Sequence, residues 1–377
     1  MNKILIIGMV DSIHTAHWIE RIVDLHWEIH IYPSRNHRRI HPLLRELIKK
    51  NQNLRLINSF PSQKFSPYMN FLTVRVNIGK FNLYCWLLKR AIETKSYSHI
   101  HCLELQHAGY LLLEAKSAIH PSTQIICTNW GSDIYYFSQF DPHLKKIREL
   151  LNLTDSYAAE CERDYELARK IGFSGKELPL IPNSFKLNSN VINPESDTAR
   201  SQIIVKCYGE VFGLGIILIS VIDKFLDMHQ DAAVLLYSVT DDLLSDAKNL
   251  ERKFPKRVRI SSIRNPMSSN QIAAEYQKSL IYIGASRSDG ISTSFLEAMN
   301  YGAFPIQTNT SCAQDWIDKG CVGRVVAPDE ETLLQTLNDV YGDLDSVKIA
   351  TRLNLNILKK YTEPSVLKEI AKSFYTL

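Results

Sequence analysis

Short apolar runs alternate with helix-like patterns along the whole chain of 377 residues. The runs have strand length, are rich in β-branched residues, and are separated by segments whose apolar positions recur at helical spacing. Strands that alternate with helices predict βαβ units, and therefore parallel sheets with helices on both faces. We expect strands at Ile4–Gly8, Glu28–Tyr32, Leu54–Ile57, His99–Leu103, Gln124–Thr128, Ser156–Ala159, Ile181, Ile203–Cys207, Ala233–Tyr237, Val258–Ser261, Leu280–Ala285, Phe304–Gln307 and Arg324–Val326.

The number of expected strands and the length of the chain both indicate two domains. The strands form two sets of about six, and the length suits two domains of roughly 180 residues each. A polar segment, Pro182–Arg200, separates the sets and is the expected hinge. We therefore predict an α/β protein with two Rossmann-like domains that face each other across a cleft. Their expected extents are residues 1–190 and 191–360, followed by a last helix over 361–377.

The most informative stretch follows the strand Leu280–Ala285. A loop with Asp289 and Gly290 leads into a short helix that Ser292 or Thr293 can cap. A loop that leads from a strand into a helix N-terminus is the arrangement in which α/β proteins hold a phosphorylated ligand. Gly302 is expected to end the helix in a left-handed conformation.

Two acidic residues of this stretch can bind hydroxyl groups. Glu297 lies inside the expected helix, where a carboxylate can accept two hydrogen bonds from a vicinal diol. Asp289, in the preceding loop, can do the same for a second set of hydroxyls. The alternative is that Asp289 makes an Asx-turn and Glu297 is a solvated helix residue.

The start of the second domain is a second candidate. A strand ending near Lys206 is followed by a glycine-containing loop and an apolar helix, which is a weak phosphate-binding pattern. Lys206 is the basic residue of this segment, although it can equally be a strand residue at the end of the sheet. Arg264 and Arg287 are further candidates for the phosphate site.

Three residues of the first domain lie in loops that follow strands and so open onto the same edge of the sheet. They are His14, His107 and Asp133. For His14 the alternative is a polar residue at a helix start, and for Asp133 a helix cap or loop residue.

Several motifs together resemble the E-x7-E signature of the family 4 retaining glycosyltransferases, with Asp289 in the first acidic position. The matching residues are Ser286, Asp289, Gly290, Glu297, Ala298, Met299, Gly302, Pro305, Gly320, Gly323, Val326, Pro328 and Asp329, and more weakly Gly131, Ser132, Asp133 and Ile181–Ser184. Trp130 stands where that family usually has histidine, a contact that His107 or Asn129 would replace, and Leu214 stands where relatives carry arginine.

This resemblance implies the GT-B fold, with the last helix crossing back to the first domain. It implies that Glu297 binds the ribose of the donor and that Asp289 meets the donor sugar. The expected catalytic residues are Asp289, Lys206 and Asp133, and the expected acceptor contacts are His14 and His107. The expected donor-binding residues are Glu297, Gly209, Gly213, Gly290, Ile291, Ser292, Thr293 and Arg264.

The implied function is that of a hexosyl- or N-acetylhexosaminyltransferase. It would use a nucleoside-diphosphate sugar, without metal or cofactor, and extend a bacterial surface glycan such as lipopolysaccharide, capsule or exopolysaccharide. Two alternatives stay open: a nucleotide-sugar epimerase on the same fold, and a non-catalytic subunit that binds sugar nucleotides. Thr240, Asp241 and Asp242 are expected to be ordinary capping residues and not a metal site.

Composition and charge limit the cellular location and the partners that we expect for the protein. No apolar run reaches the roughly 18 residues of a membrane-spanning helix, and seven isolated cysteines suit reduced thiols in a cytoplasmic protein. The net charge is +4, but residues 35–50 are a basic, amphipathic stretch. This stretch is expected either to contact an anionic membrane surface or to be a solvated helix face. Nucleic acid is not an expected partner, because no binding motif is present.

Overall fold

The computed structural model divides into two compact units, each with its own parallel sheet. It describes residues 2–35, 37, 39–57, 77–78, 81–183, 185, 187 and 200–376. Unit 1 comprises Met1–Ser184 together with Ser365–Leu377, and unit 2 comprises Phe185–Pro364. The predicted boundary between residues 190 and 191 lies outside the described residues.

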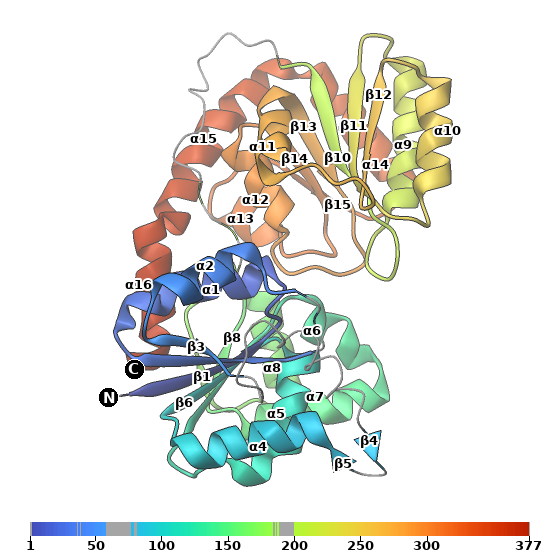
Figure 1. Cartoon of the computed structure of the whole chain (residues 1–377). Coiled ribbons are helices and arrows are strands. Elements are labelled where there is room, and N and C mark those ends of the chain that lie inside the picture. The colour runs from blue at the N-terminus through green and yellow to red at the C-terminus, as the bar shows by residue number, and fades with distance from the viewer. Residues whose placement is uncertain are drawn as a thin grey trace. The chain divides into compact units, whose positions relative to one another are not determined.

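Unit 1 has a seven-stranded parallel sheet with the order β3-β2-β1-β6-β7-β8-β9 (Figure 1). The strands are β1 (Lys3–Gly8), β2 (Glu28–Pro33), β3 (Leu54–Leu56), β6 (His99–Leu103), β7 (Gln124–Thr128), β8 (Ser156–Ala158) and β9 (Lys176–Glu177). The helices are α1 (Ile13–Ile22), α2 (Pro42–Lys50), α4 (Leu83–Lys95), α5 (Tyr110–Ala115), α6 (Ser132–Tyr135), α7 (Asp141–Leu153), α8 (Glu162–Ile171) and α16 (Pro364–Thr376). A separate short hairpin joins β4 (Asn77–Ile78) and β5 (Phe81–Asn82).

Unit 2 has a six-stranded parallel sheet with the order β12-β11-β10-β13-β14-β15. The strands are β10 (Gln202–Lys206), β11 (Ala233–Val239), β12 (Val258–Ser262), β13 (Ser279–Gly284), β14 (Phe304–Thr308) and β15 (Arg324–Val326). The helices are α9 (Gly215–Met228), α10 (Leu244–Lys253), α11 (Ser269–Lys278), α12 (Thr293–Asn300), α13 (Gln314–Asp318), α14 (Glu330–Gly342) and α15 (Leu344–Thr362).

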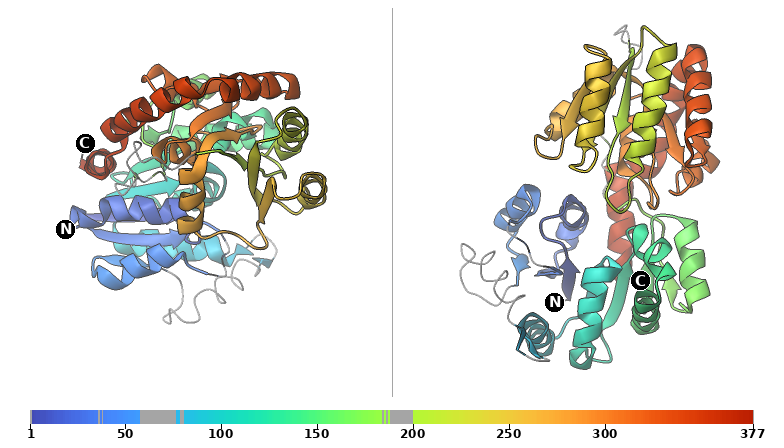
Figure 2. Two further views of the ribbon diagram at one scale, coloured as in Figure 1. Left: turned by 90° about the horizontal axis from the view of Figure 1, so that it is seen from above. Right: turned by 90° about the vertical axis from the view of Figure 1, so that its right-hand side faces the viewer.

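Helices cover both faces of each sheet, which Figure 2 shows from two further sides. This explains why the central strands are continuous apolar runs and not alternating ones. In unit 1, side chains of β1 point alternately into two cores. Leu5 and Ile7 join the core with α4, α5 and α7, while Ile4 and Ile6 join the core with α1, α2 and α16.

The observed strands lie where the apolar runs predict strands, and one predicted strand is absent from the described residues. Ile181 is buried but belongs to no strand, and the last strand of unit 1 is β9, a few residues earlier. Pro179 and Pro182 flank Ile181, and a proline has no N–H to donate to a strand neighbour. The segment therefore packs against the core without joining the sheet.

The basic stretch 35–50 contains helix α2, Pro42–Lys50, whose apolar side chains face the core of unit 1. Leu44 is fully buried, and Ile40, Leu43, Leu47 and Ile48 pack against the same core as α1. Arg38 lies outside the described residues, while Arg45, Lys49 and Lys50 are exposed. Lys50 pairs with Glu46 at 2.6 Å. The apolar side of the amphipathic pattern thus reflects packing of α2 on unit 1, and contact of its basic side with a membrane surface stays a prediction. No helix of the described residues has the length and apolar character needed to span a membrane.

A buried polar network fixes α16 to the sheet of unit 1. The Trp18 Nε1–H donates to the Tyr375 hydroxyl at 2.9 Å, and that hydroxyl lies 2.6 Å from His101 Nδ1. Because indole only donates, the tyrosine must donate to Nδ1, and the imidazole proton sits on Nε2, 2.5 Å from Thr128 Oγ1. Burial lowers the pKa of His101 to about 3, so the ring stays neutral.

Replacing Tyr375 by Phe should destabilise unit 1. The change leaves the indole N–H of Trp18 and Nδ1 of His101 buried without their partner, and each unmade bond costs about 1–3 kcal/mol. We expect a loss of roughly 2–4 kcal/mol in urea unfolding followed by tryptophan fluorescence. The matched control is Tyr361→Phe on α15, whose hydroxyl has no partner in the described part of the chain. An equal effect of the two substitutions would contradict the network.

Candidate functional site

The candidate site of unit 2 lies at the carboxyl ends of β10 and β13. These two strands are neighbours in the sheet, but the chain leaves β10 toward β11 on one side and returns at β13 on the other (Figure 1). Such a switch point leaves a crevice outside the strand ends, which is where open α/β sheets bind ligands. Lys206 ends β10, and the loop to Glu297 follows β13.

The glycine-containing loop after β10 is folded tightly against its neighbour. The Gly215 N–H donates to the Tyr208 carbonyl and the Gly213 N–H to the Gly209 carbonyl, both at 2.9 Å. A Cβ atom on Gly213 would lie 1.9 Å from the Tyr208 carbonyl oxygen, so this position needs glycine. The loop therefore forms a compact turn at the N-terminus of α9.

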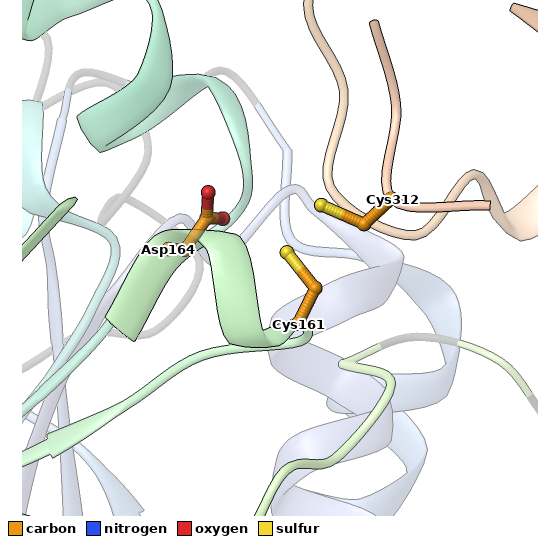
Figure 3. A group of neighbouring side chains, drawn as sticks. All are labelled: Cys161, Asp164 and Cys312. Carbon is orange, nitrogen blue, oxygen red and sulfur yellow. The ribbon is translucent and has the colours of Figure 1, made fainter. Parts of the chain in front are cut away.

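The loop after β13 is held by backbone bonds from both sides. Gly213 bridges to Ser286, and the Arg287 N–H donates to the Phe212 carbonyl at 2.7 Å. Further on, the N–H of Cys312 donates to the Gly290 carbonyl at 2.9 Å. Figure 3 shows Cys312 on the loop that follows β14. The predicted ligand loop is thus braced by the two loops next to it.

Helix α12 begins and ends as its sequence predicts. Ser292 is the N-cap residue, and Gly302, at φ 82°, takes the left-handed conformation after the helix. The Ser292 side chain makes no hydrogen bond to the first turn of the helix, so the predicted side-chain cap is not formed by Ser292. Ile291 and Ser292 are buried, whereas Thr293 is partly exposed. The helix N-terminus therefore lies in the loop that follows β13, beside Asp289.

Glu297 is an acid in an apolar setting with one cation near it. Burial raises the pKa of Glu297 to about 7, and the nearby charge of Lys206 acts in the opposite direction. The hydroxyls of Tyr237 and Tyr276, which bond to each other at 2.8 Å, lie in the same neighbourhood. The structure thus brings together Lys206 and Glu297, which the sequence singled out separately.

Asp289 and Tyr208 also belong to this group. The Lys206 Nζ lies 5.1 Å from the centre of the Tyr208 ring. Burial raises the pKa of Tyr208, and the charge of the nearby Asp289 carboxylate raises it further. Sequence reasoning missed Tyr208; its place directly after the strand of Lys206, beside the glycines, was the available signal.

Two residues considered for the phosphate site lie elsewhere. Arg264 follows β12, the edge strand; it is 70% exposed and pairs with Asp241 at 2.6 Å. Leu214 is buried in the core of unit 2 with only 8% of its surface exposed. An arginine at position 214 would therefore displace core packing.

The predicted residues of unit 1 gather at the corresponding edge of its own sheet. His14 lies in the first turn of α1, which Ser12 caps, and its ring is 4.9 Å from that of Trp130 with a tilt of 34°. Asp133 lies in α6, and its Oδ2 accepts the backbone N–H groups of Leu105 and Trp130, each at 3.0 Å. Asp133 therefore bonds to the backbone of two loops, as in the alternative interpretation of this residue as a loop or cap residue.

A further acid stands next to Asp133, and sequence reasoning did not select it. Glu104 follows β6 and accepts the N–H groups of His107 at 2.7 Å and Ala108 at 2.5 Å. The exposed His107 lies in a single π-helical turn, Leu105–Gly109. Partial desolvation of its ring and the charge of Arg35 lower its pKa, so the imidazole is neutral at neutral pH. The signal for Glu104 was an acid directly after an apolar strand.

Asp164 supports the same edge of unit 1 from α8. Its carboxylate accepts the Asn129 amide at 2.6 Å and the Arg163 Nε–H at 2.9 Å. Figure 3 shows Asp164 one turn into α8, after Cys161, which precedes the helix. Asn129 is the residue after β7, so this bond fixes the start of the loop that carries Trp130.

The family model described as "Glycosyl transferase 4-like" matches residues 3–156. No curated protein sequence matches the chain at a significant level. Solved structures match over the full length of the chain at low sequence identity.

Three of these structures show the range of similar proteins. HepE from Anabaena, in complex with UDP and glucose, is 12% identical with a TM-score of 0.72, covering 100% of both chains. Sucrose-phosphate synthase from Thermosynechococcus elongatus is 12% identical with a TM-score of 0.72, covering 100% of this chain and 98% of that one. The apo form of the lipopolysaccharide outer core galactosyltransferase WaaB is 12% identical with a TM-score of 0.67, covering 100% of both chains.

These similarities define the fold. The chain has the GT-B architecture of two Rossmann-like domains with C-terminal helices, as in glycosyltransferases. Within unit 1, residues 3–156 match a glycosyl transferase 4-like domain.

The raised pKa of Glu297 gives a first test of the site. If Glu297 accepts hydrogen bonds from a ribose diol, the ionised form binds and the protonated form does not. Affinity for UDP-glucose should then rise with pH through about 7. It should be about tenfold weaker one pH unit below the pKa, where about a tenth of the carboxyls is ionised. Calorimetric titration over this range measures it.

Glu297→Gln should remove this pH dependence and weaken binding by about 1.5–3 kcal/mol. Lys206→Ala should move the midpoint of the wild-type pH dependence upward, because Lys206 lowers the pKa of Glu297. Glu331→Gln, an exposed position on α14, is the control and should behave as the wild type. A pH dependence that persists in Glu297→Gln would exclude Glu297 from the site.

Proposed function

We propose that this protein is a retaining, metal-independent glycosyltransferase that uses a nucleoside-diphosphate sugar. The observation that carries the proposal is the grouping of Lys206, Glu297 and Asp289 at the switch point of unit 2, in a chain with the GT-B fold. Glu297 would hold the ribose, Asp289 the transferred sugar, and Lys206 the diphosphate.

The proposed transfer reaction requires stabilisation of the diphosphate leaving group and does not require a nucleophile from the enzyme. Cleavage of the bond between sugar and diphosphate develops negative charge on the phosphate oxygens. Lys206, at the end of β10, is a favourable neighbour for that charge. Attack by the acceptor hydroxyl on the same face of the sugar would retain the anomeric configuration.

The acceptor is proposed to be a hydroxyl group of a growing bacterial surface glycan. The similar structures include a lipopolysaccharide galactosyltransferase, which supports this substrate class. His14, Trp130 and His107 lie at the carboxyl edge of the sheet of unit 1 and are the proposed acceptor contacts. A neutral imidazole and an aromatic face suit a sugar ring better than a phosphate group.

Turnover of UDP-glucose with a panel of lipid-linked and free oligosaccharides tests the proposal. Transfer should persist in EDTA, and NMR of the product should show the anomeric configuration of the donor. Lys206→Ala should lower kcat on the order of 100-fold, because charge on the diphosphate grows toward the transition state. Lys248→Ala on the exposed face of α10 is the control.

Three results would contradict the proposal. Epimerisation of the donor without acceptor would indicate an epimerase. Donor binding without turnover on any acceptor would indicate a binding subunit. Near-normal turnover of Lys206→Ala combined with loss in Arg264→Ala would move the phosphate site toward β12.

Contact with an anionic membrane surface is proposed to be electrostatic only, since the apolar face of α2 is packed on unit 1. Each basic side chain near such a surface contributes about 1 kcal/mol. Arg39→Glu combined with Arg45→Glu should reduce binding to liposomes that contain phosphatidylglycerol, and high salt should abolish it. Lys248→Glu with Arg252→Glu on α10 is the control of equal charge. Equal liposome binding of both double variants would remove α2 as the contact.

A further inference from the structure

Glu104 occupies the switch point of the sheet of unit 1. Its strand β6 pairs with β1, and from β1 the chain continues on the other side, toward β2. The backbone of Glu104 has φ 134° and ψ 155°, a region that is essentially restricted to glycine. A strained residue of this kind costs about 1–3 kcal/mol and persists only where the surroundings hold it.

The side chain of Glu104 is what holds this conformation. Its two carboxyl oxygens accept the N–H groups of His107 and Ala108, which belong to the turn that Glu104 begins. That turn is π-helical, a form that is rare and frequent at functional sites. The strain at Glu104 and the position of His107 therefore depend on the same carboxyl group.

Asp133 ties this turn to the loop that carries Trp130. One carboxylate oxygen accepts N–H groups from both segments, those of Leu105 and Trp130. The Gln106 side-chain amide donates to the Asp133 carbonyl at 2.8 Å, which makes a second link. The two acids thus form one connected support under His107 and Trp130.

The two carboxyl groups are both buried and bond to the same backbone turn. Glu104 is 3% and Asp133 is 8% exposed, and neither forms an ion pair within the part of the chain that the structure describes. Two buried like charges near each other disfavour double ionisation. Burial, together with the charge of Asp133, raises the pKa of Glu104 to about 8, against the backbone bonds from His107 and Ala108. Burial raises that of Asp133 to about 6, opposed by its backbone bonds.

The other polar groups around the pair act in both directions. The buried Ser34 hydroxyl, after β2, lies near the Glu104 carboxyl and favours its ionised form. Asp164, on α8, adds a negative charge near Asp133 and is itself bonded to Arg163. His107 is influenced by Arg35 and Asp11, which pair with each other at 3.3 Å. Tyr110, on α5, has its pKa raised to about 12 and stays protonated.

We propose that Glu104 and Asp133 act as one unit in which two buried carboxyl groups share a single negative charge, and that this unit positions His107 and Trp130 for the acceptor. The role toward an acceptor rests on the proposed function; the shared charge does not. Glu104 is a positioning residue here, because its carboxyl bonds to the backbone of the turn. Ionisation of both acids would place two adjacent charges under the turn and loosen it.

The shared charge can be measured without any substrate. In NMR spectra of the ¹⁵N-labelled, deuterated full chain, the amide signals of His107 and Ala108 report the carboxyl that they contact. Between about pH 5 and about pH 10 they should titrate with a midpoint near 8, well above the ordinary value of about 4.3. Asp133→Asn should lower that midpoint, because it removes the charge that raises the pKa of Glu104.

Glu104→Gln cannot ionise and supplies the control, with one acceptor oxygen in place of two. Its His107 and Ala108 amides should show no titration up to about pH 10, while Glu104→Ala removes the side-chain acceptor of both N–H groups. Once an acceptor is known, transfer should fall above about pH 8 in the wild type and not in Glu104→Gln. A wild-type midpoint below pH 5, or an unchanged titration in Glu104→Gln, would overturn the shared charge. Equal alkaline loss of transfer in both proteins would overturn the positioning role alone.

Discussion

The crevice at the switch point of each parallel sheet is the constraint on which the functional arrangement depends. Helices cover both faces of the strands, so their side chains belong to the cores, and polar groups collect at the carboxyl ends. In unit 2 the edge between β10 and β13 brings Lys206 and Glu297 together. In unit 1 the edge between β1 and β6 places Glu104 beside Asp133. The chemistry of both units follows from where the strand order reverses.

Burial at these edges determines how readily the acids ionise. Glu297 is partly and Glu104 almost wholly withdrawn from water, and the pKa of each is raised, to about 7 and about 8. They differ in their charged neighbours: Glu297 has the charge of Lys206, which favours the ionised form, whereas Glu104 has the charge of another acid. A carboxylate suits hydrogen bonds from a ribose diol, and a buried carboxyl that accepts two backbone N–H groups suits a structural link to a turn. In our proposals Glu297 is therefore a ligand of the donor and Glu104 a support of the turn.

The sequence predicts the fold well, because alternating apolar runs report burial directly. His99–Leu103, Gln124–Thr128 and Arg324–Val326 are strands with the predicted bounds. Ile181 shows the limit, since its burial is real but the flanking prolines keep it out of the sheet. The basic stretch 35–50 shows another: a helix packed on a core and a helix on a membrane have the same pattern. Proximity of Lys206 to Glu297, and the strained backbone of Glu104, depend on tertiary packing that no local pattern encodes.

The central claim is that unit 2 binds a nucleoside diphosphate at the carboxyl ends of β10 and β13. Hydrogen–deuterium exchange with and without UDP tests it most directly, because it reports every backbone amide and presumes no acceptor. The account predicts that UDP protects peptides covering residues 207–215 and 285–297, with little change at the amino ends of the same strands. Protection confined to other parts of the chain, or none at saturating UDP, would contradict the account.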